Sequence, residues 1–399
     1  MLGFNISTHW SSLTAAFYVM QGIVGMCAIY FATRRQLCEG HIPSFKNKYI
    51  FAWWFLWVFF AVFRLVQDGI GGGDAVTYIN YFNYCNSATI TSWFEHVGSD
   101  LGFKWLNKFV RYLFVDYHFY FLIIYGFMAF SYISFLKSYA PAKTNYIPYL
   151  LSFFLFLRSY SSIRSNLAIA FIAFGCVFMI EQKWKHAYVI AFAAIFFHKA
   201  AVLYAAGVAF CHFFSKRKLT VKKAVVLVVF ASLIARVLQS MFLQYASTTD
   251  MNGAYEAYAS RSINVSFIDG AWKIAFEQML LAGVMFFTSR RIGKNHSEED
   301  EKKIKLIWLL CIFDIILIPV NFTIGSWRGY EFFYLARIVM WGECLYQIFR
   351  NTSRDLRFVC QMFLLVCFAS WMVFRVYATY MTSNLSPYVF YPLYFKLSL

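Results

Sequence analysis

The sequence predicts an all-α, polytopic transmembrane helical bundle with about twelve passes. Hydrophobic residues make up 61% of the 399 residues and charged residues only 14%, a balance far from that of an ordinary globular domain. Apolar runs recur along the whole chain, and about 20 such residues suffice to cross a bilayer. The connections between the runs are short and basic. We therefore expect residues 1–399 to form a single integral membrane domain.

The spans are predicted from the apolar runs, each bounded to within a few residues. In chain order they are residues 11–33, 49–66, 117–136, 146–158, 165–181, 187–198, 200–214, 224–243, 271–289, 306–320, 332–348 and 359–376. The first run has no basic region before it and no small-residue cleavage site after it. It is therefore predicted to be a retained helix rather than a signal peptide.

Basic connections set the predicted orientation. Lysines and arginines gather at 34–48, 137–143, 183–185, 215–223, 290–305 and 350–357. By the positive-inside rule these connections face the cytoplasm. Alternation then places both termini outside, together with a large loop at 67–116, a turn at 158–164, a second loop at 244–270 and the segment 321–333. The large loop is expected to hold short interfacial helices.

His198 and Lys199 interrupt the apolar stretch "FAAIFFHKAAVLYAAG". They fall between two spans that are both shorter than the ~20 residues of a full crossing. Such a hairpin tip is tolerated where it lines a protein-enclosed or watery cavity, which indicates a site. The alternative is that His198 is a packed, hydrogen-bonded histidine with no further role.

Several cations map to the outer ends of helices, where the topology rule does not require them. They are Arg64, Arg158, Arg164, His198, Lys199, Arg236, Arg328, Arg337 and Arg375. Ionisable groups in or near hydrocarbon are costly, so a group of them facing one cavity implies an anion, and the planar arginine fork suits phosphate. Alternatively, each arginine extends to lipid headgroups or pairs with a carboxylate such as Asp314, Glu277 or Glu343.

Two outer segments carry paired arginines. Arg158 and Arg164 bracket a tight turn in which Ser161 or Ser162 is expected to cap the following helix, whose N-terminus also favours an anion. In "GSWRGYEFFYLAR", Arg337 lies nine residues after Arg328 and out of helical phase with it. Arg328 is the favoured site residue of that pair.

The loop "DGIGGGDAVTYINYFN" places three glycines before Asp74, followed by aromatic residues at helical spacing, Tyr78 among them. Glycines permit a close backbone approach, and Asp74 could hold a sugar hydroxyl or accept its proton. The alternative is a flexible loop in which Asp74 caps an interfacial helix.

Other classes of site are not indicated. The nine cysteines lie mostly in apolar runs without a C-x-x-C pair, so neither disulfides nor a zinc site are expected. No Asp-x-Asp pair marks a metal. The net charge of +17 is spread among hydrophobic helices, which argues against nucleic acid as a partner.

Five segments, taken in their order along the chain, resemble the EpsG branch of the Wzy-type polysaccharide polymerases. They are "GGGDAVTYINYF", "IRSNLAIAF", "FFHKAAVLY", "RGYEFFYLAR" and "NLSPYVFYP". The resemblance covers most of the chain. It departs from the family pattern at Ser165, where a glutamine is expected. It implies a fold like that of the GT-C lipid-carrier glycosyltransferases and a location in the bacterial inner membrane, with the active site facing the periplasm.

The resemblance also implies the activity, which is to join oligosaccharide repeat units carried on undecaprenyl pyrophosphate. Asp74 or His198 would deprotonate the acceptor hydroxyl, while arginines stabilise the departing pyrophosphate. Transfer is expected to be inverting and independent of metals and cofactors, with membrane lipid and a chain-length regulator protein as further partners. The predicted catalytic residues are Asp74, His198, Arg164 and Arg328, and the predicted substrate-binding residues are Arg158, Lys199, Tyr78, Arg337 and Tyr330.

Three other functions remain open at this point. A flippase for lipid-linked sugars shares the same hydrophobic character, although alternating access usually brings internal repeats and charges reachable from both sides. An outer-face glycan ligase or a membrane acyltransferase could also use an arginine and a histidine. The glycine–aspartate loop favours the polymerase.

Overall fold

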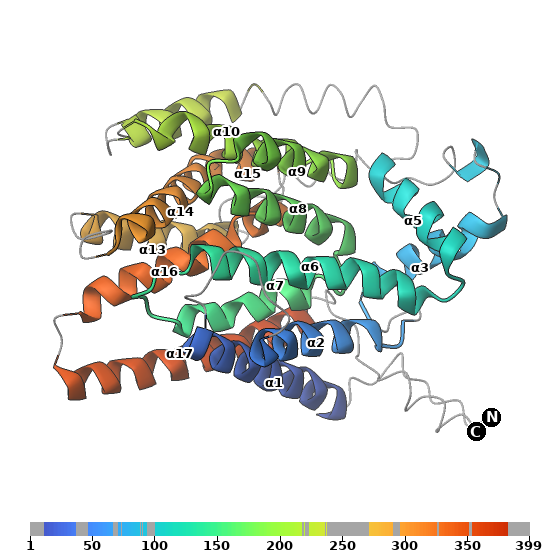
Figure 1. The fold of residues 1–399 in the computed structure, drawn as a ribbon, viewed down its shortest axis with the longest axis horizontal. Helices are drawn as coiled ribbons and strands as arrows, with labels where there is room; N and C mark the ends of the chain where they lie inside the picture. Colours follow the sequence, from blue (N-terminus) through green and yellow to red (C-terminus); the bar gives the residue numbers. More distant parts are fainter. Residues whose placement is uncertain are drawn as a thin grey trace.

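The structure is a computed structural model of the whole chain. It describes residues 12–36, 47–66, 71–72, 74–87, 89, 91–93, 100–217, 219, 223–235, 237, 271–289, 296–324, 327–350 and 353–381. Within these residues every regular element is a helix, which confirms the all-α class, and the long helices lie roughly alongside one another in a bundle (Figure 1).

The elements follow one another in chain order. They are α1 (Ser12–Gln36), α2 (Lys48–Val62), α3 (Ala75–Ser87), α5 (Leu101–Leu113), α6 (Tyr117–Tyr139), η1 (Ile147–Leu151), α7 (Ser152–Arg158), α8 (Ile163–Ile180), α9 (Trp184–Phe197), α10 (Ala201–Ser215), α13 (Ala271–Thr288), α14 (Glu298–Ile316), α15 (Ile318–Ile324), η3 (Trp327–Glu331), α16 (Tyr334–Phe349) and α17 (Arg354–Met381). A further apolar helix spans Lys223–Ala235.

Each predicted span overlaps one of these helices. Within the described ranges, two helices are long and apolar enough to cross a membrane by themselves, Tyr117–Tyr139 and Ile163–Ile180, and several shorter apolar helices accompany them. The number of passes therefore stays a prediction. Arg236, the loop 244–270 and the motif "NLSPYVFYP" lie outside the described residues, as does the side chain of Arg375.

Several helices begin earlier than the apolar pattern predicts, α14, α17 and α9 among them. The acidic and basic residues before the apolar part of α14 form its first turns, where Ser297 accepts a hydrogen bond from the Asp300 amide at 3.2 Å. Ion pairs between residues four apart, such as Glu298–Lys302 at 2.7 Å, support these turns. At α9 the ring of Trp184 stacks on His212 with centroids 4.3 Å apart, which fixes the start of that helix.

The centre of the bundle is formed by α6 and α8, with α1 and α2 on one side and α9 and α10 on the other (Figure 1). Small residues let α8 and α9 approach closely: a Cβ at Gly175 would lie 3.0 Å from the Ala187 carbonyl oxygen. Ala187, Ala191 and Ala194 are fully buried and recur on one face of α9. Small residues at such spacing are typical of helix pairs in membranes.

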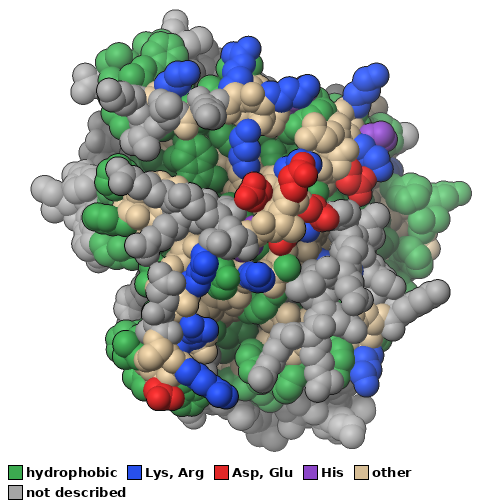
Figure 2. All heavy atoms as spheres, turned by 60° about the vertical axis from the view of Figure 1, so that its left-hand side comes forward, with side chains coloured by type: hydrophobic (Ala, Val, Ile, Leu, Met, Phe, Trp, Pro, Cys, Tyr) green, Lys and Arg blue, Asp and Glu red, His purple; other side chains and the backbone are tan. Residues whose placement is uncertain are grey.

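The two ends of the bundle differ in charge. The end turned forward in Figure 2 carries many lysine and arginine side chains and a smaller acidic group. Exposed cations of the predicted cytoplasmic connections include Lys183, Lys185, Arg350, Arg354 and Arg357. At the opposite end lie α3 and α5, which form part of the loop predicted to be extracytoplasmic (Figure 1).

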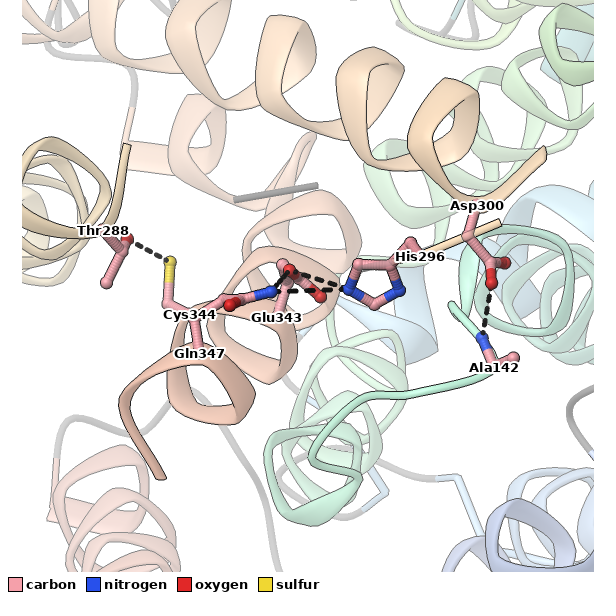
Figure 3. Close-up of polar contacts among 7 residues, drawn as sticks. All are labelled: Ala142, Thr288, His296, Asp300, Glu343, Cys344 and Gln347. Atoms are coloured by element: carbon pink, nitrogen blue, oxygen red, sulfur yellow. Dashed lines mark hydrogen bonds and ion pairs between the residues drawn. The ribbon is translucent and has the colours of Figure 1, made fainter. Parts of the chain in front are cut away.

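A buried polar cluster joins helices near the basic end (Figure 3). His296 Nε2 lies 3.2 Å from Glu343 Oε1, and the Gln347 amide donates to the same oxygen at 2.7 Å. Close by, Asp300 accepts a hydrogen bond from the Ala142 amide at 3.3 Å. Glu343, considered from the sequence as a partner for an arginine, thus pairs with a histidine that lies just before α14, in a contact between that segment and α16.

Candidate functional site

The turn between α7 and α8 is the centre of the candidate site. Arg158 ends α7, and Arg164 lies in the first turn of α8. Ser162 occupies the N-cap position, but its side chain makes no capping hydrogen bond, contrary to the prediction. Instead its carbonyl accepts hydrogen bonds from the amide and the side chain of Asn166, at 3.1 and 3.0 Å.

Arg64 holds this turn from inside the protein. Its fully buried guanidinium donates to the carbonyl oxygens of Gly71 at 2.7 Å and Tyr160 at 3.2 Å, to the Tyr125 hydroxyl at 2.7 Å and to the Ala61 carbonyl. It also lies 4.4 Å from the centroid of the Phe121 ring. Arg64 therefore joins α2, α6, the glycine loop and the turn, and its interactions explain its position without a ligand.

The glycine loop packs directly on the turn. Gly71 and Gly72 have φ angles of 81° and 125°, a region that side chains disfavour. A Cβ at Gly72 would lie 2.2 Å from the Tyr160 carbonyl oxygen. The predicted close backbone approach thus occurs, and its partner is the turn that carries the arginines. Half-buried Asp74 lies two residues after Gly72 and directly precedes α3, and its carbonyl accepts a hydrogen bond from the Tyr78 amide at 3.3 Å.

Asp100 brings two of the predicted residues together. Its Oδ2 lies 3.4 Å from Arg164 Nη1 and 3.7 Å from His198 Nδ1. Asp100 occupies the N-cap position of α5, Arg164 belongs to α8, and His198 ends α9. The hairpin tip and the arginine turn, 34 residues apart in sequence, therefore meet at one buried carboxylate.

Two lysines complete this group. Burial lowers the pKa of Lys104 from its ordinary value; the negative charge of Asp100 opposes that shift, and the positive charge of Lys199 adds to it. We name Asp100, Lys104, Arg164, His198 and Lys199 the Asp100 cluster. It holds three lysine or arginine charges against one carboxylate, so two positive charges remain when His198 is neutral.

The second arginine of the turn has its own carboxylate. Arg158 Nε lies 2.5 Å from Glu331 Oε1. Glu331 ends η3, the short helix that also contains Arg328, whose side chain lies outside the described part of the chain. Gly329 permits this helix to pack closely, because a Cβ there would lie 2.1 Å from the Tyr204 hydroxyl oxygen. The Arg328 segment and the arginine turn are therefore neighbours.

Four of the sequence motifs thus meet at one end of the bundle. The EpsG family matches residues 48–390 of the chain, which is most of its length. The chain belongs to the EpsG family. This family is associated with polysaccharide biosynthesis, and the chain itself has apolar helices, so the protein is a membrane protein of the polysaccharide polymerase type. No curated protein and no solved structure matches the chain.

Three residues predicted to bind substrate make contacts within this EpsG-family fold. Arg337 is buried, with Nη1 2.7 Å from Asp314 Oδ2, Nε 3.6 Å from Glu277 Oε1, and Nη2 donating to the Tyr330 carbonyl at 2.6 Å. Tyr330 is itself buried. Tyr78 is buried against Phe103, with ring centroids 5.2 Å apart. From the sequence, one alternative is that an arginine pairs with a carboxylate such as Asp314 or Glu277. That alternative therefore holds for Arg337.

Asp100, Lys104 and Glu331 are the residues of the site that sequence reasoning did not single out. Glu331 lies inside the motif "RGYEFFYLAR", and an acidic residue three positions after Arg328 was a signal that it could serve as a partner. Asp100 precedes the amphipathic stretch "LGFKWLNKFVRYL", the pattern of an N-cap before a surface helix. Among the described residues, no three His, Cys, Asp or Glu side chains gather as metal ligands would.

Proposed function

We propose that this EpsG-family protein is a polymerase that joins oligosaccharide repeat units carried on undecaprenyl pyrophosphate, at the outer face of the bacterial inner membrane. The observation that carries the proposal is the meeting of Arg164 and His198 at Asp100. Glycosyl transfer from a diphosphate needs a base for the acceptor hydroxyl and a cation for the departing diphosphate, and His198 and Arg164 can supply them.

The charge of the Asp100 cluster fits such a substrate. A diphosphate diester has two negative charges, which match the two positive charges that the cluster keeps when His198 is neutral. Arg164 would bind the diphosphate, while Lys104 and Lys199 would balance its charge as the bond to the anomeric carbon breaks. Arg158, and Arg328 in the adjacent η3, would extend the cationic surface along the substrate.

The base is assigned to the histidine in this proposal. Asp100 Oδ2 lies 3.7 Å from His198 Nδ1, and a hydrogen bond formed between them when substrate binds would orient the ring and leave Nε2 to accept the proton of the acceptor hydroxyl. The hydroxyl oxygen then attacks the anomeric carbon, the bond to the diphosphate oxygen breaks, and the lipid diphosphate leaves. One displacement of this kind inverts the anomeric centre and needs no metal. Asp74, which follows the glycine loop that packs on the turn, would hold a sugar hydroxyl.

The test is made in a cell that lacks the native copy. Arg164→Ala and His198→Ala should each leave single repeat units on the lipid carrier and abolish long chains, as seen on gels of the polysaccharide and by mass spectrometry of the lipid fraction. Lys185→Ala, which removes an exposed cation at the opposite end, should behave as wild type. Long chains of normal length in both site variants would overturn the proposal. Units retained on the cytoplasmic side would instead identify a transporter.

A further inference from the structure

Helix α5 differs from the long helices because it is amphipathic and lies at one end of the bundle (Figure 1). Its buried side chains are Phe103, Asn107 and Val110, which recur at helical spacing and face the protein. Phe103 contacts the rings of Tyr78 and Tyr120, at centroid distances of 5.2 and 6.4 Å. One side of α5 is thus fixed on α3 and α6.

The opposite side of α5 is apolar and exposed. Leu101, Trp105, Phe109 and Tyr112 are each more than half exposed, and they recur at intervals of three or four residues. Such a stripe of large apolar side chains is rare on a surface that faces only water, and it usually marks contact with another apolar phase.

Cations lie along one border of this stripe. Lys104, Lys108 and Arg111 follow at helical spacing between the exposed apolar side and the buried side. Lys108 Nζ donates to the Cys85 carbonyl at 2.7 Å, which holds its charge on that border. A helix with a large apolar face bordered by lysine and arginine is typical of segments that lie in the interface of a membrane with anionic lipids.

The apolar stripe continues a surface of the bundle itself. On α9, Val189, Phe192 and Phe196 are exposed and recur on one side. Gly102 of α5 packs on the end of this row, since a Cβ there would lie 2.8 Å from the Phe196 Cβ. The exposed apolar surface therefore passes from α9 onto α5 at the point where the bundle ends. In a membrane protein this surface of α9 faces acyl chains, and its continuation faces the same phase.

We infer that α5 lies in the outer leaflet of the membrane, with Leu101, Trp105, Phe109 and Tyr112 among the acyl chains of bilayer phospholipids and its cations at the level of the phosphates. Phospholipid is the occupant because the border is cationic and because the face continues that of α9. Asp100 begins this helix, so the depth of α5 fixes the depth of the Asp100 cluster. That depth is where the diphosphate of a membrane-anchored substrate lies.

Photo-crosslinking of the full chain tests this inference without any measurement of activity. The photoreactive residue p-benzoylphenylalanine replaces Phe109 or Tyr112 in two separate variants, which are reconstituted in vesicles of phosphatidylethanolamine and phosphatidylglycerol with alkyne-tagged acyl chains. Asn80, an exposed polar position on α3, is the negative control, and Phe119, an exposed position on α6, is the positive control. After irradiation, lipid adducts are quantified by mass spectrometry of the peptides.

We expect phospholipid adducts at positions 109 and 112 at yields close to that of position 119 and about tenfold above that of position 80. Yields as low as that of position 80, or crosslinks to a second copy of the chain in their place, would overturn the inference. Loss of the adducts on addition of a polyprenyl diphosphate would also overturn it, because the face would then belong to the substrate. Since no polymerisation is measured, failure here is separate from failure of the proposed function.

Discussion

Arg337 provides the sharpest separation between a structural role and a substrate-binding role. Its guanidinium is buried beside Asp314 and Glu277 and donates to the Tyr330 carbonyl. Replacing Arg337 alone by leucine leaves the fully buried Asp314 carboxylate without its cation. Breaking one side of a buried ion pair costs about 3–5 kcal/mol, which is a large part of the stability of most proteins.

The double variant Arg337→Leu, Asp314→Leu should behave differently. Replacing both members of a buried pair by apolar residues is often neutral or stabilising, so two costs remain. The carbonyl of Tyr330 loses its donor, at about 1–3 kcal/mol, and the half-buried carboxylate of Glu277 loses its cation in the single and the double variant alike. The double variant should therefore be about 2 kcal/mol more stable than the single one. Equilibrium unfolding in mixed detergent micelles measures both against wild type.

The length of the polysaccharide made in cells decides between the two roles. If Arg337 is structural, long chains are lost in the single variant together with folded protein, and the double variant restores both. A double variant that is folded and stable but makes no long chains would refute this reasoning and return Arg337 to the substrate. A single variant as stable as the double one would refute the buried pair itself.

Three further predictions concern the site. Gly72→Ala should destabilise the protein by about 1–3 kcal/mol and abolish long chains, because the added Cβ meets the Tyr160 carbonyl of the arginine turn and the backbone has a positive φ. The control Gly283→Ala, which has open space around it, should be stable and active in the same unfolding and chain-length assays. Lys199→Met should raise the pKa of Lys104, because it removes a nearby positive charge. The pH dependence of Lys104 acylation, followed by mass spectrometry, should therefore shift to higher pH. An unchanged profile would show that the two lysines do not interact. Asp100→Asn, which keeps the shape of the side chain and removes its charge, should leave lipid-linked single units without long chains, and wild-type polymer would deny it a role.

The sequence was sufficient for the class of the fold and for most helices because apolar runs report burial directly. It placed the boundaries less well where charges belong to a helix, as at Ser297–Lys302, since ion pairs four residues apart are not visible in hydropathy. It also could not give the number of passes, because apolar helices such as α9 are shorter than a full span.

For the site, the order of the motifs predicted which segments are functional, but not which side chains meet. Arg158, Arg164 and Arg337 look alike in sequence, yet each has its own carboxylate in the structure: Glu331, Asp100 and Asp314. These partners lie between 23 and 173 residues away along the chain. Pairing over such distances depends on helix packing, which a single sequence does not report.

The central claim is that the Asp100 cluster binds a lipid-linked diphosphate, and binding itself is the most direct measurement. Native mass spectrometry of the protein in nanodiscs, titrated with undecaprenyl diphosphate, gives the affinity for that probe. Because a charge-assisted hydrogen bond contributes about 1.5–3 kcal/mol, Arg164→Ala should weaken binding roughly 10- to 100-fold, while Lys185→Ala should leave it unchanged. Equal affinities in wild type and both variants would contradict the account.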